Sequence, residues 1–414
     1  MNRYLSLDLL RGLSIFGMVF SALVPFGVLP AWMYHIQNPP PNHNLDITIS
    51  GISWVDLVFP IFIFCMGVAI PLSGREKIKK NQRKSITLVY VKETIERFFM
   101  LWLFSYLYLF LNFSWAKGLL PQFLTILGFI SLFLFYYRYG KQFSKKRVLL
   151  IRGIGVVSMV SLVLVGYFVF DQEISIYRSG IIIFLLAFLY LFGSLIWYFT
   201  RDSLKRRLIV FIAILLFMVV TLPFELQGKL YAIKEIRWFF NMEYIYFLLI
   251  LLPATYIGDL LHRQLSLSSD ISSVGFKKVI KKELLLALIL ALGGGVAFFI
   301  EGSIKKVPCT LSYCLITPAI AIFLLIVADL IVERFRRSYF VRIFVGAGSN
   351  PLMSYVIFGN FLMPLFKLTS IIYIYEAAYP SGYPWIGVAR AFCIVLFTMA
   401  IVAKFSEKKV YWRA

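Results

Sequence analysis

The stretch WVDLVFPIFIFCMGVAIPLSG, residues 54–74, decides the fold class, because it is long enough to cross a membrane and carries a single charged residue, Asp56. A transmembrane helix needs about 20 mostly apolar residues. The whole chain has the same character, since 60% of its 414 residues are hydrophobic and 15% are charged, against about 45–50% and about 25% in soluble domains. One soluble core cannot bury this excess. The composition therefore excludes a soluble globular protein, a disordered chain and a secreted disulfide scaffold.

Twelve apolar runs are candidate spans, and we expect each to be helical because lipid offers no partner to unpaired backbone groups. The run at 342–366 contains Gly346, Gly348 and Pro351, so it is expected to be broken or re-entrant. The prediction is an all-α polytopic bundle of about 11–12 transmembrane helices, which forms a single domain over residues 1–414. The runs cover approximately residues 5–29, 54–74, 91–113, 119–138, 148–170, 179–200, 207–224, 241–262, 283–301, 311–333, 342–366 and 385–403.

The basic residues predict how the chain is threaded through the membrane. The formal net charge is +22, and most Lys and Arg residues lie in clusters at 75–84, 141–147, 201–207, 263–282, 334–342 and 404–413. The loops that alternate with these clusters contain fewer Lys and Arg residues. The positive-inside rule then places both termini in the cytoplasm. The loop at 30–53, which has no Lys or Arg, falls outside. Anionic lipids explain the positive charge, so we expect no nucleic acid partner.

Two of the three histidines in the chain, His35 and His43, lie in this outside loop. Either ring is a polar loop residue or a catalytic base. Ser53 and Asp56 follow at the start of the next span, with the spacing of a capping box, which needs no function beyond starting a helix. The alternative is that Asp56 orients a histidine of the loop, fixing its tautomer and making the other ring nitrogen a better base.

Other polar residues are costly at their positions and are candidate ligand contacts. Asp8 and Arg11 share a helix face: they complement the helix dipole and pair with each other, or Arg11 holds an anionic ligand such as a phosphate. Lys305 and Lys306 lie in an outside loop where lysine is scarce, and they either receive an anionic group or lie in water. Asn350 interrupts an apolar run, where broken helices line cavities.

Several classes of chemistry have no motif in the chain. The four cysteines show no CxxC or Cys/His metal spacing, so no metal is expected. Cys309 and Cys314 are close enough for a disulfide, although nothing in the sequence requires one. Walker A, Rossmann, HExxH and GxSxG motifs are absent from the sequence, which argues against ATP-driven transport, metalloprotease and α/β-hydrolase chemistry.

Four stretches together resemble the heparan-α-glucosaminide N-acetyltransferase family, particularly its bacterial membrane members. They are RYLSLDLLRGL at 3–13, WVDLVFPIFIFCMG at 54–67, IKKVPCTLSY at 304–313 and GSNPLMSY at 348–355. The resemblance implies an enzyme of the bacterial cytoplasmic membrane. It would move acetyl from cytosolic acetyl-CoA to a glucosamine-type amino sugar on the periplasmic side.

The resemblance also implies roles for residues. The family's catalytic histidine follows an aromatic cluster and precedes the Asp-Leu-Val-Phe-Pro motif. His35, after Trp32-Met33-Tyr34, matches that context, whereas His43 matches the usual distance from the motif. Asp56 would orient the histidine. From their own chemistry and position, Arg11, Asp8 and Asn350 are candidate contacts for acetyl-CoA, and Lys305, Lys306 and Trp54 are candidate substrate contacts.

Two rival functions remain open from the residues. One is a secondary transporter of a small solute, for which twelve spans with both ends inside is a common plan, although no related halves are visible here. The other is an O-acyltransferase acting on a cell-envelope polysaccharide or lipid. The expected partners are a small-molecule or glycan acceptor and membrane lipids, with a homodimer as a further option.

Overall fold

The computed structural model describes residues 4–80, 86–140, 143–221, 229, 233, 243–267, 273–379 and 382–412. These residues form no β-strand, which confirms the all-α prediction. The helices are α1 (Leu5–Ser21), η1 (Ala31–Met33), α2 (Trp54–Lys80), α3 (Ile86–Phe110), α4 (Leu119–Tyr136), α5 (Lys145–Phe170), α6 (Ile181–Thr200), α7 (Leu204–Thr221), α10 (Glu243–Tyr246), α11 (Leu248–Leu267), α12 (Ser273–Glu301), α13 (Leu311–Phe335), α14 (Tyr339–Gly348), α15 (Pro351–Ile357), η2 (Phe358–Leu362), α16 (Met363–Leu368), α17 (Ile371–Ala377) and α18 (Pro384–Glu407).

The chain is an integral membrane protein. Within the described ranges, nine helices are long and apolar enough to cross a membrane, with α10 and α11 taken as one and α15 to α16 as another. The helices α1, α3 and α7 are formed as predicted but do not belong to these nine. The first has 17 residues, and the other two carry clusters of charged side chains in their N-terminal halves.

Two predicted runs differ in detail from the helices observed. The first was expected to extend to residue 29, but α1 ends at Ser21, because Pro25 cannot donate a backbone hydrogen bond and Gly27 has a positive φ of 71°. The run at 342–366 is broken, as predicted, at Pro351. Residues 222–224 and 241–242 of two predicted spans lie outside the described residues. So do residues 81–84, 141–142, 268–272 and 413 of the basic clusters.

The chain groups into two compact units, where the sequence predicted one domain. Unit 1 comprises Met1–Leu10, Pro30–Phe99 and Leu185–Arg336, and unit 2 comprises Arg11–Leu29, Met100–Phe184 and Arg337–Ala414. Each unit therefore collects three separate stretches of chain, and neither is a contiguous segment.

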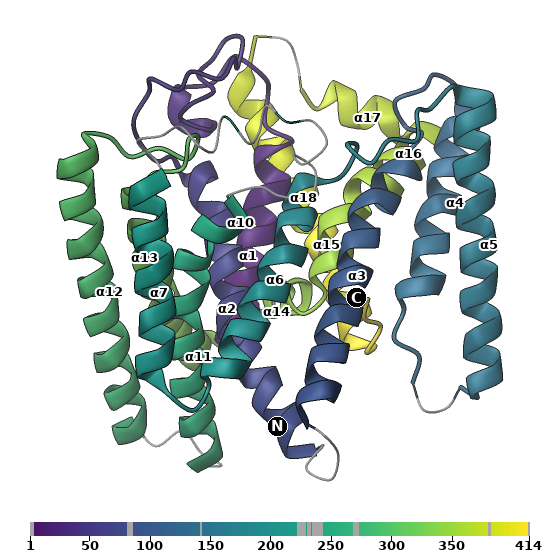
Figure 1. Ribbon diagram of the computed structural model, residues 1–414. Coiled ribbons are helices and arrows are strands. Elements are labelled where there is room, and N and C mark those ends of the chain that lie inside the picture. The colour runs from purple at the N-terminus through teal and green to yellow at the C-terminus, as the bar shows by residue number, and fades with distance from the viewer. Residues whose placement is uncertain are drawn as a thin grey trace. The chain divides into compact units, whose positions relative to one another are not determined.

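Unit 1 is built around the close packing of α2 against α11. A Cβ added at Gly67 of α2 would lie 2.6 Å from the carbonyl oxygen of Leu251, and one added at Gly258 of α11 would lie 2.4 Å from that of Val68. Glycine is therefore needed on both helices where their backbones meet. The helices α7, α12 and α13 run beside this pair (Figure 1).

The loops that precede α2 and α13 meet at one end of unit 1. The Gly51 amide donates to the Ile304 carbonyl at 2.9 Å. Glu301, the last residue of α12, accepts the amides of Leu311 and Ser312 at 2.7 and 3.0 Å, and these are unpaired donors at the start of α13. The loop 302–310 is thus fixed at both ends, and it holds the loop 30–53 beside it.

Unit 2 contains a separate aromatic core formed by Phe104, Phe113, Phe129, Tyr136 and Trp412. Within it α4 packs against α5, and α14 packs against α18. Large apolar side chains on α5 are exposed, among them Leu149, Val157 and Phe168, as expected of a surface that meets lipid.

Candidate functional site

A histidine and a carboxylate meet at the start of α2 in unit 1. Nδ1 of His35 lies 2.7 Å from Oδ1 of Asp56. The Asp56 side chain is 3% exposed, whereas the His35 side chain is 43% exposed. The carboxylate is therefore enclosed by protein, while the imidazole it holds remains open on its other side.

The second oxygen of the same carboxylate starts the helix. Oδ2 of Asp56 accepts the Ser53 amide at 3.1 Å, the Ser53 hydroxyl at 2.9 Å and the Ile36 amide at 3.1 Å. The contact with the Ser53 amide is the returning half of a capping box. The sequence left two interpretations of Asp56 open, a helix cap and a group that orients a histidine. Both hold, because Oδ2 caps the helix and Oδ1 contacts the histidine.

This arrangement fixes the tautomer of His35. A carboxylate accepts hydrogen bonds and donates none, so Nδ1 carries the hydrogen, and in the neutral ring Nε2 carries the lone pair. In chemical terms the half-exposed ring presents a base or a nucleophile at Nε2. The negative charge of Asp56 would stabilise the imidazolium that forms when Nε2 takes a proton.

Gln37 ties this histidine segment to the lysine loop 302–310. Its Oε1 accepts the amides of Lys306 and Val307 at 3.2 and 2.9 Å, and its Nε2 donates to the Val307 carbonyl. Gln37 is 3% exposed. The structure thus brings the predicted residues His35, Asp56, Lys305 and Lys306 to one end of unit 1, although the two loops are about 270 residues apart.

Lys306 contributes an ammonium group whose pKa depends on its burial and on nearby carboxylates. Burial lowers the pKa of its ammonium below the ordinary range, and the negative charges of Asp56 and Glu243 oppose this shift. Trp54, the third predicted substrate contact, is the first residue of α2 and is partly buried.

Beneath the site lies Tyr313 of α13, which is fully buried and donates its hydroxyl to the Asp56 carbonyl at 2.8 Å. Cys309 and Cys314 are buried free thiols whose sulfur atoms are 3.3 Å apart. Sequence reasoning gave no role to Gln37, Tyr313 or Glu243. Only Tyr313 stood within a motif, and no spacing in the sequence pairs it with Asp56.

His43 occupies a different position in the same loop. Its ring packs edge-on against Tyr34 with 4.3 Å between centroids, and its backbone adopts a left-handed φ of 52°. Its carbonyl accepts the Asn38 side-chain amide at 3.0 Å. The ring that Asp56 contacts is that of His35, so the geometry singles out His35 of the two candidates.

Of the predicted acetyl-CoA contacts, Asp8 is buried on α1 in unit 1, whereas Arg11 and Asn350 belong to unit 2. In unit 2, Nη1 of Arg11 donates to the Gly348 carbonyl at 3.3 Å. Asn350 is fully buried, where its Nδ2 donates to the Val410 carbonyl and its Oδ1 accepts the Trp412 amide, both at 3.0 Å. Asn350 therefore anchors the C-terminal segment, and its amide is not available to a ligand in this arrangement.

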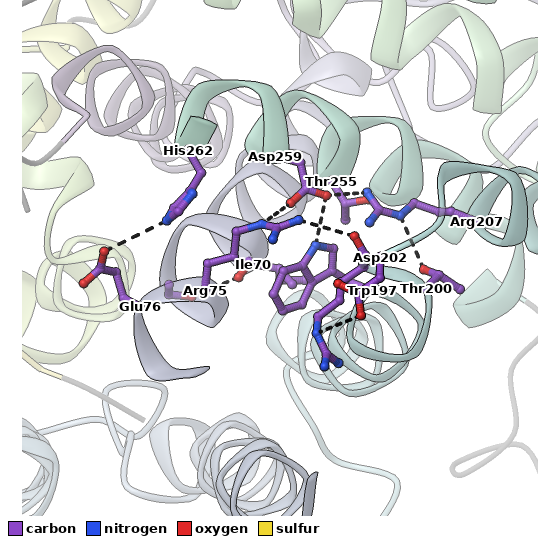
Figure 2. A network of polar contacts seen from close by, with 12 residues as sticks. Ile70, Arg75, Glu76, Trp197, Thr200, Asp202, Arg207, Thr255, Asp259 and His262 are labelled. Atoms are coloured by element: carbon purple, nitrogen blue, oxygen red, sulfur yellow. Dashed lines mark hydrogen bonds and ion pairs between the residues drawn. The ribbon is translucent and has the colours of Figure 1, made fainter. Parts of the chain in front are cut away.

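A charged network lies at the opposite end of unit 1. Figure 2 shows Asp259 of α11 between two arginines: Oδ1 accepts Nε of Arg75 at 2.7 Å, and Oδ2 accepts Nη1 of Arg207 at 2.9 Å and Nε1 of Trp197 at 3.2 Å. Arg75 lies 19 residues after Asp56 on α2, which corresponds to about 29 Å along a helix. The histidine site and this network are thus separated by about the thickness of a bilayer core.

The chain belongs to a family described as a domain of unknown function, DUF5009. The family model matches residues 3–261, so the DUF5009 region contains His35, Asp56 and the Asp259 network, whereas Lys306 and Tyr313 follow it. None of the curated proteins compared with the chain matches it.

Proposed function

We propose that this DUF5009 protein is a membrane-embedded acetyltransferase. It moves an acetyl group from cytosolic acetyl-CoA to a glucosamine-type amino sugar on the periplasmic side of a bacterial cytoplasmic membrane. The observation that carries the proposal is the 2.7 Å contact between buried Asp56 and half-exposed His35. The sequence resemblance supplies the reaction, and the geometry supports a group able to perform it.

His35 would act through Nε2, the ring nitrogen that Asp56 leaves unprotonated. An amino sugar arrives as an ammonium ion, so Nε2 must first take one of its protons to free the lone pair of the nitrogen. That nitrogen then forms a bond to the acetyl carbon, the carbon–sulfur bond breaks, and the leaving CoA thiolate takes up a proton from the imidazolium. In a second route Nε2 attacks the acetyl carbon itself, the carbon–sulfur bond breaks to release CoA, and the acetyl-imidazole then transfers the acetyl group to the free amine. Asp56 balances the positive imidazole in both routes.

The remaining candidate residues are assigned either to acetyl-CoA or to the acceptor. Acetyl-CoA supplies the thioester, and its phosphates need cations such as Arg11. The buried amide of Asn350 does not fit a ligand contact. On the acceptor side, Lys306 places a positive charge near Asp56. This charge suits the carbonyl oxygen that becomes negative during transfer, and Lys305 and Trp54 remain proposed acceptor contacts.

The test uses the full chain in lipid nanodiscs with radiolabelled acetyl-CoA. The acceptors are glucosamine, glucose and none, and the variants are His35→Ala and His43→Ala, each checked for folding by size-exclusion chromatography. We expect label on glucosamine, a loss of about 100-fold or more in His35→Ala and retained activity in His43→Ala. Loss in His43→Ala alone would transfer the role to His43. Label on glucose alone would indicate O-acylation, and solute uptake without transfer would indicate a transporter.

A further inference from the structure

Two acidic residues lie inside adjacent membrane helices of unit 1, away from the histidine site. Glu283 of α12 precedes the end of that helix at Glu301 by 18 residues, and Asp329 of α13 follows the start at Leu311 by 18 residues. Each is therefore about 27 Å along its helix from the loop 302–310. The helices α12 and α13 pack against each other, so the two carboxyl groups are at the same depth.

The hydrogen bonding of these carboxyl groups is incomplete. Glu283 is 0% exposed, and neither of its oxygens has a hydrogen-bond partner in the part of the chain that the structure describes. Oδ1 of Asp329 accepts the Tyr4 hydroxyl at 2.6 Å, but Oδ2 is buried and has no such partner there. The two carboxyl groups interact electrostatically. Three buried acceptor oxygens of this pair thus have no donor among the residues that the structure describes.

Among the residues that the structure describes, no positive side chain balances the pair. The groups that act on Asp329 are Ser6, Tyr4 and Glu333, and the charge that acts on Glu283 is that of Asp329. The helices α2, α7 and α11, which also pack against α12 or α13, contribute no described charge to either carboxyl group. Burying one unpaired carboxylate is costly, and two like charges at close range cannot both persist.

We propose that Glu283 and Asp329 form an intramembrane proton-binding site in which the pair holds one proton. Protonation removes the negative charge from one of two buried carboxyl groups that repel each other. Tyr4 donates to Oδ1 of Asp329 and so connects the site to the segment before α1. The described residues contain no group of three metal-binding side chains, and a single proton needs only one carboxyl oxygen to hold it.

The proposal is independent of acetyl transfer, because the pair lies at the end of unit 1 opposite His35. Ionisable residues within membrane helices are typical of proton and ion pathways. A proton would enter this site from the side of the membrane that carries Arg75 and Asp259, and its release would leave two negative charges facing each other.

Infrared spectroscopy of the full chain in nanodiscs tests the proposal through the C=O stretch of protonated carboxyl groups. We expect a protonated band at neutral pH that is lost in Glu283→Gln and retained in Glu96→Gln, a variant of an exposed glutamate. Asp329→Asn removes the neighbouring negative charge, so the band should disappear at a lower pH than in the wild type. This second variant keeps the test decisive if Glu283→Gln does not fold.

Two results would overturn the proposal. The first is the absence of a protonated band at neutral pH, or a band that Glu283→Gln leaves unchanged. The second is loss of the wild-type band when choline chloride is replaced by sodium chloride at constant pH, since the pair would then hold sodium rather than a proton. Neither result bears on transfer by His35.

Discussion

Asp56 holds His35 with one carboxylate oxygen and starts its own helix with the other. Oδ1 lies 2.7 Å from Nδ1 of the histidine, and Oδ2 accepts the Ser53 amide at 3.1 Å. Because the helix start fixes the carboxylate, it also fixes the direction of the ring. The orientation of the imidazole is therefore set by a rigid element, although His35 itself lies in a loop.

Replacing Asp56 by asparagine should separate its two roles, which are to start α2 and to hold His35. The amide oxygen can still accept the Ser53 amide, so we expect the thermal midpoint to change little. The negative charge that stabilises an imidazolium is lost, and the rate of acetyl transfer should fall by about 100-fold or more. The measurement is kcat with glucosamine. Asp46→Asn, which alters an acidic residue of the same loop bound to Thr48, should keep near wild-type activity; an equal loss in both variants would contradict the assignment.

Gln37 should be a positioning residue for the same ring. Gln37→Ala removes the hydrogen bonds to Lys306 and Val307, so the loop 30–53 loses a link to the lysine loop. We expect at least a tenfold fall in transfer and faster proteolysis within the loop, because leaving a buried hydrogen-bonding group without its partner costs roughly 1–3 kcal/mol. Gln37→Glu keeps the accepting oxygen and should recover part of both properties. Protease resistance equal to wild type in Gln37→Ala would refute the link.

The sequence predicted the helices well because a bilayer imposes a simple rule. An apolar run such as 119–138 has no alternative to helix in lipid, and α4 is observed there. The break at Pro351 could also be predicted, since proline cannot continue the hydrogen-bond ladder. The end of α1 was placed too late: Pro25 carried the same signal, but the apolar residues on either side of it favoured a span that continued to residue 29.

The site was predictable only in part. The spacing of Ser53 and Asp56 indicates a helix start, and His35 lies close enough in sequence to reach it. Gln37 and Lys306 are joined by contacts across about 270 residues, and no local pattern contains that information. For Asn350 the local pattern was misleading. An amide in a broken helix suggested a contact in a cavity, but the amide is bound by the carbonyl of Val410 in the C-terminal segment.

Lys306 should titrate below ordinary lysine. Burial lowers its pKa, so the neutral, reactive amine appears at a lower pH than in a free lysine, whose pKa is about 10.4. Amine labelling at a series of pH values, quantified by mass spectrometry, should place the half-maximal reaction of Lys306 below that of a lysine peptide. Asp56→Asn removes a negative charge that opposes the shift and should lower the midpoint further. A midpoint at or above that of the peptide would contradict the lowered pKa, because burial would then not outweigh the negative charges of Asp56 and Glu243.

Arg207 should be needed for the stability of unit 1, because it is 4% exposed and donates to Asp259, Thr255 and Thr200. Arg207→Gln removes the guanidinium from this enclosed site and leaves Asp259 short of a partner. Breaking a buried ion pair costs about 3–5 kcal/mol, so we expect a marked fall in the thermal midpoint measured by circular dichroism in detergent.

The adjacent residue provides the control. Arg206 is exposed at the start of the same helix, so Arg206→Gln removes an equal charge without touching Asp259, and the midpoint should stay near that of the wild type. Trp197 donates its indole N–H to the same carboxylate, so its fluorescence should change in Arg207→Gln and not in Arg206→Gln. Equal midpoints in the two variants would mean that Arg75 alone satisfies Asp259, and that the second arginine serves a purpose other than stability.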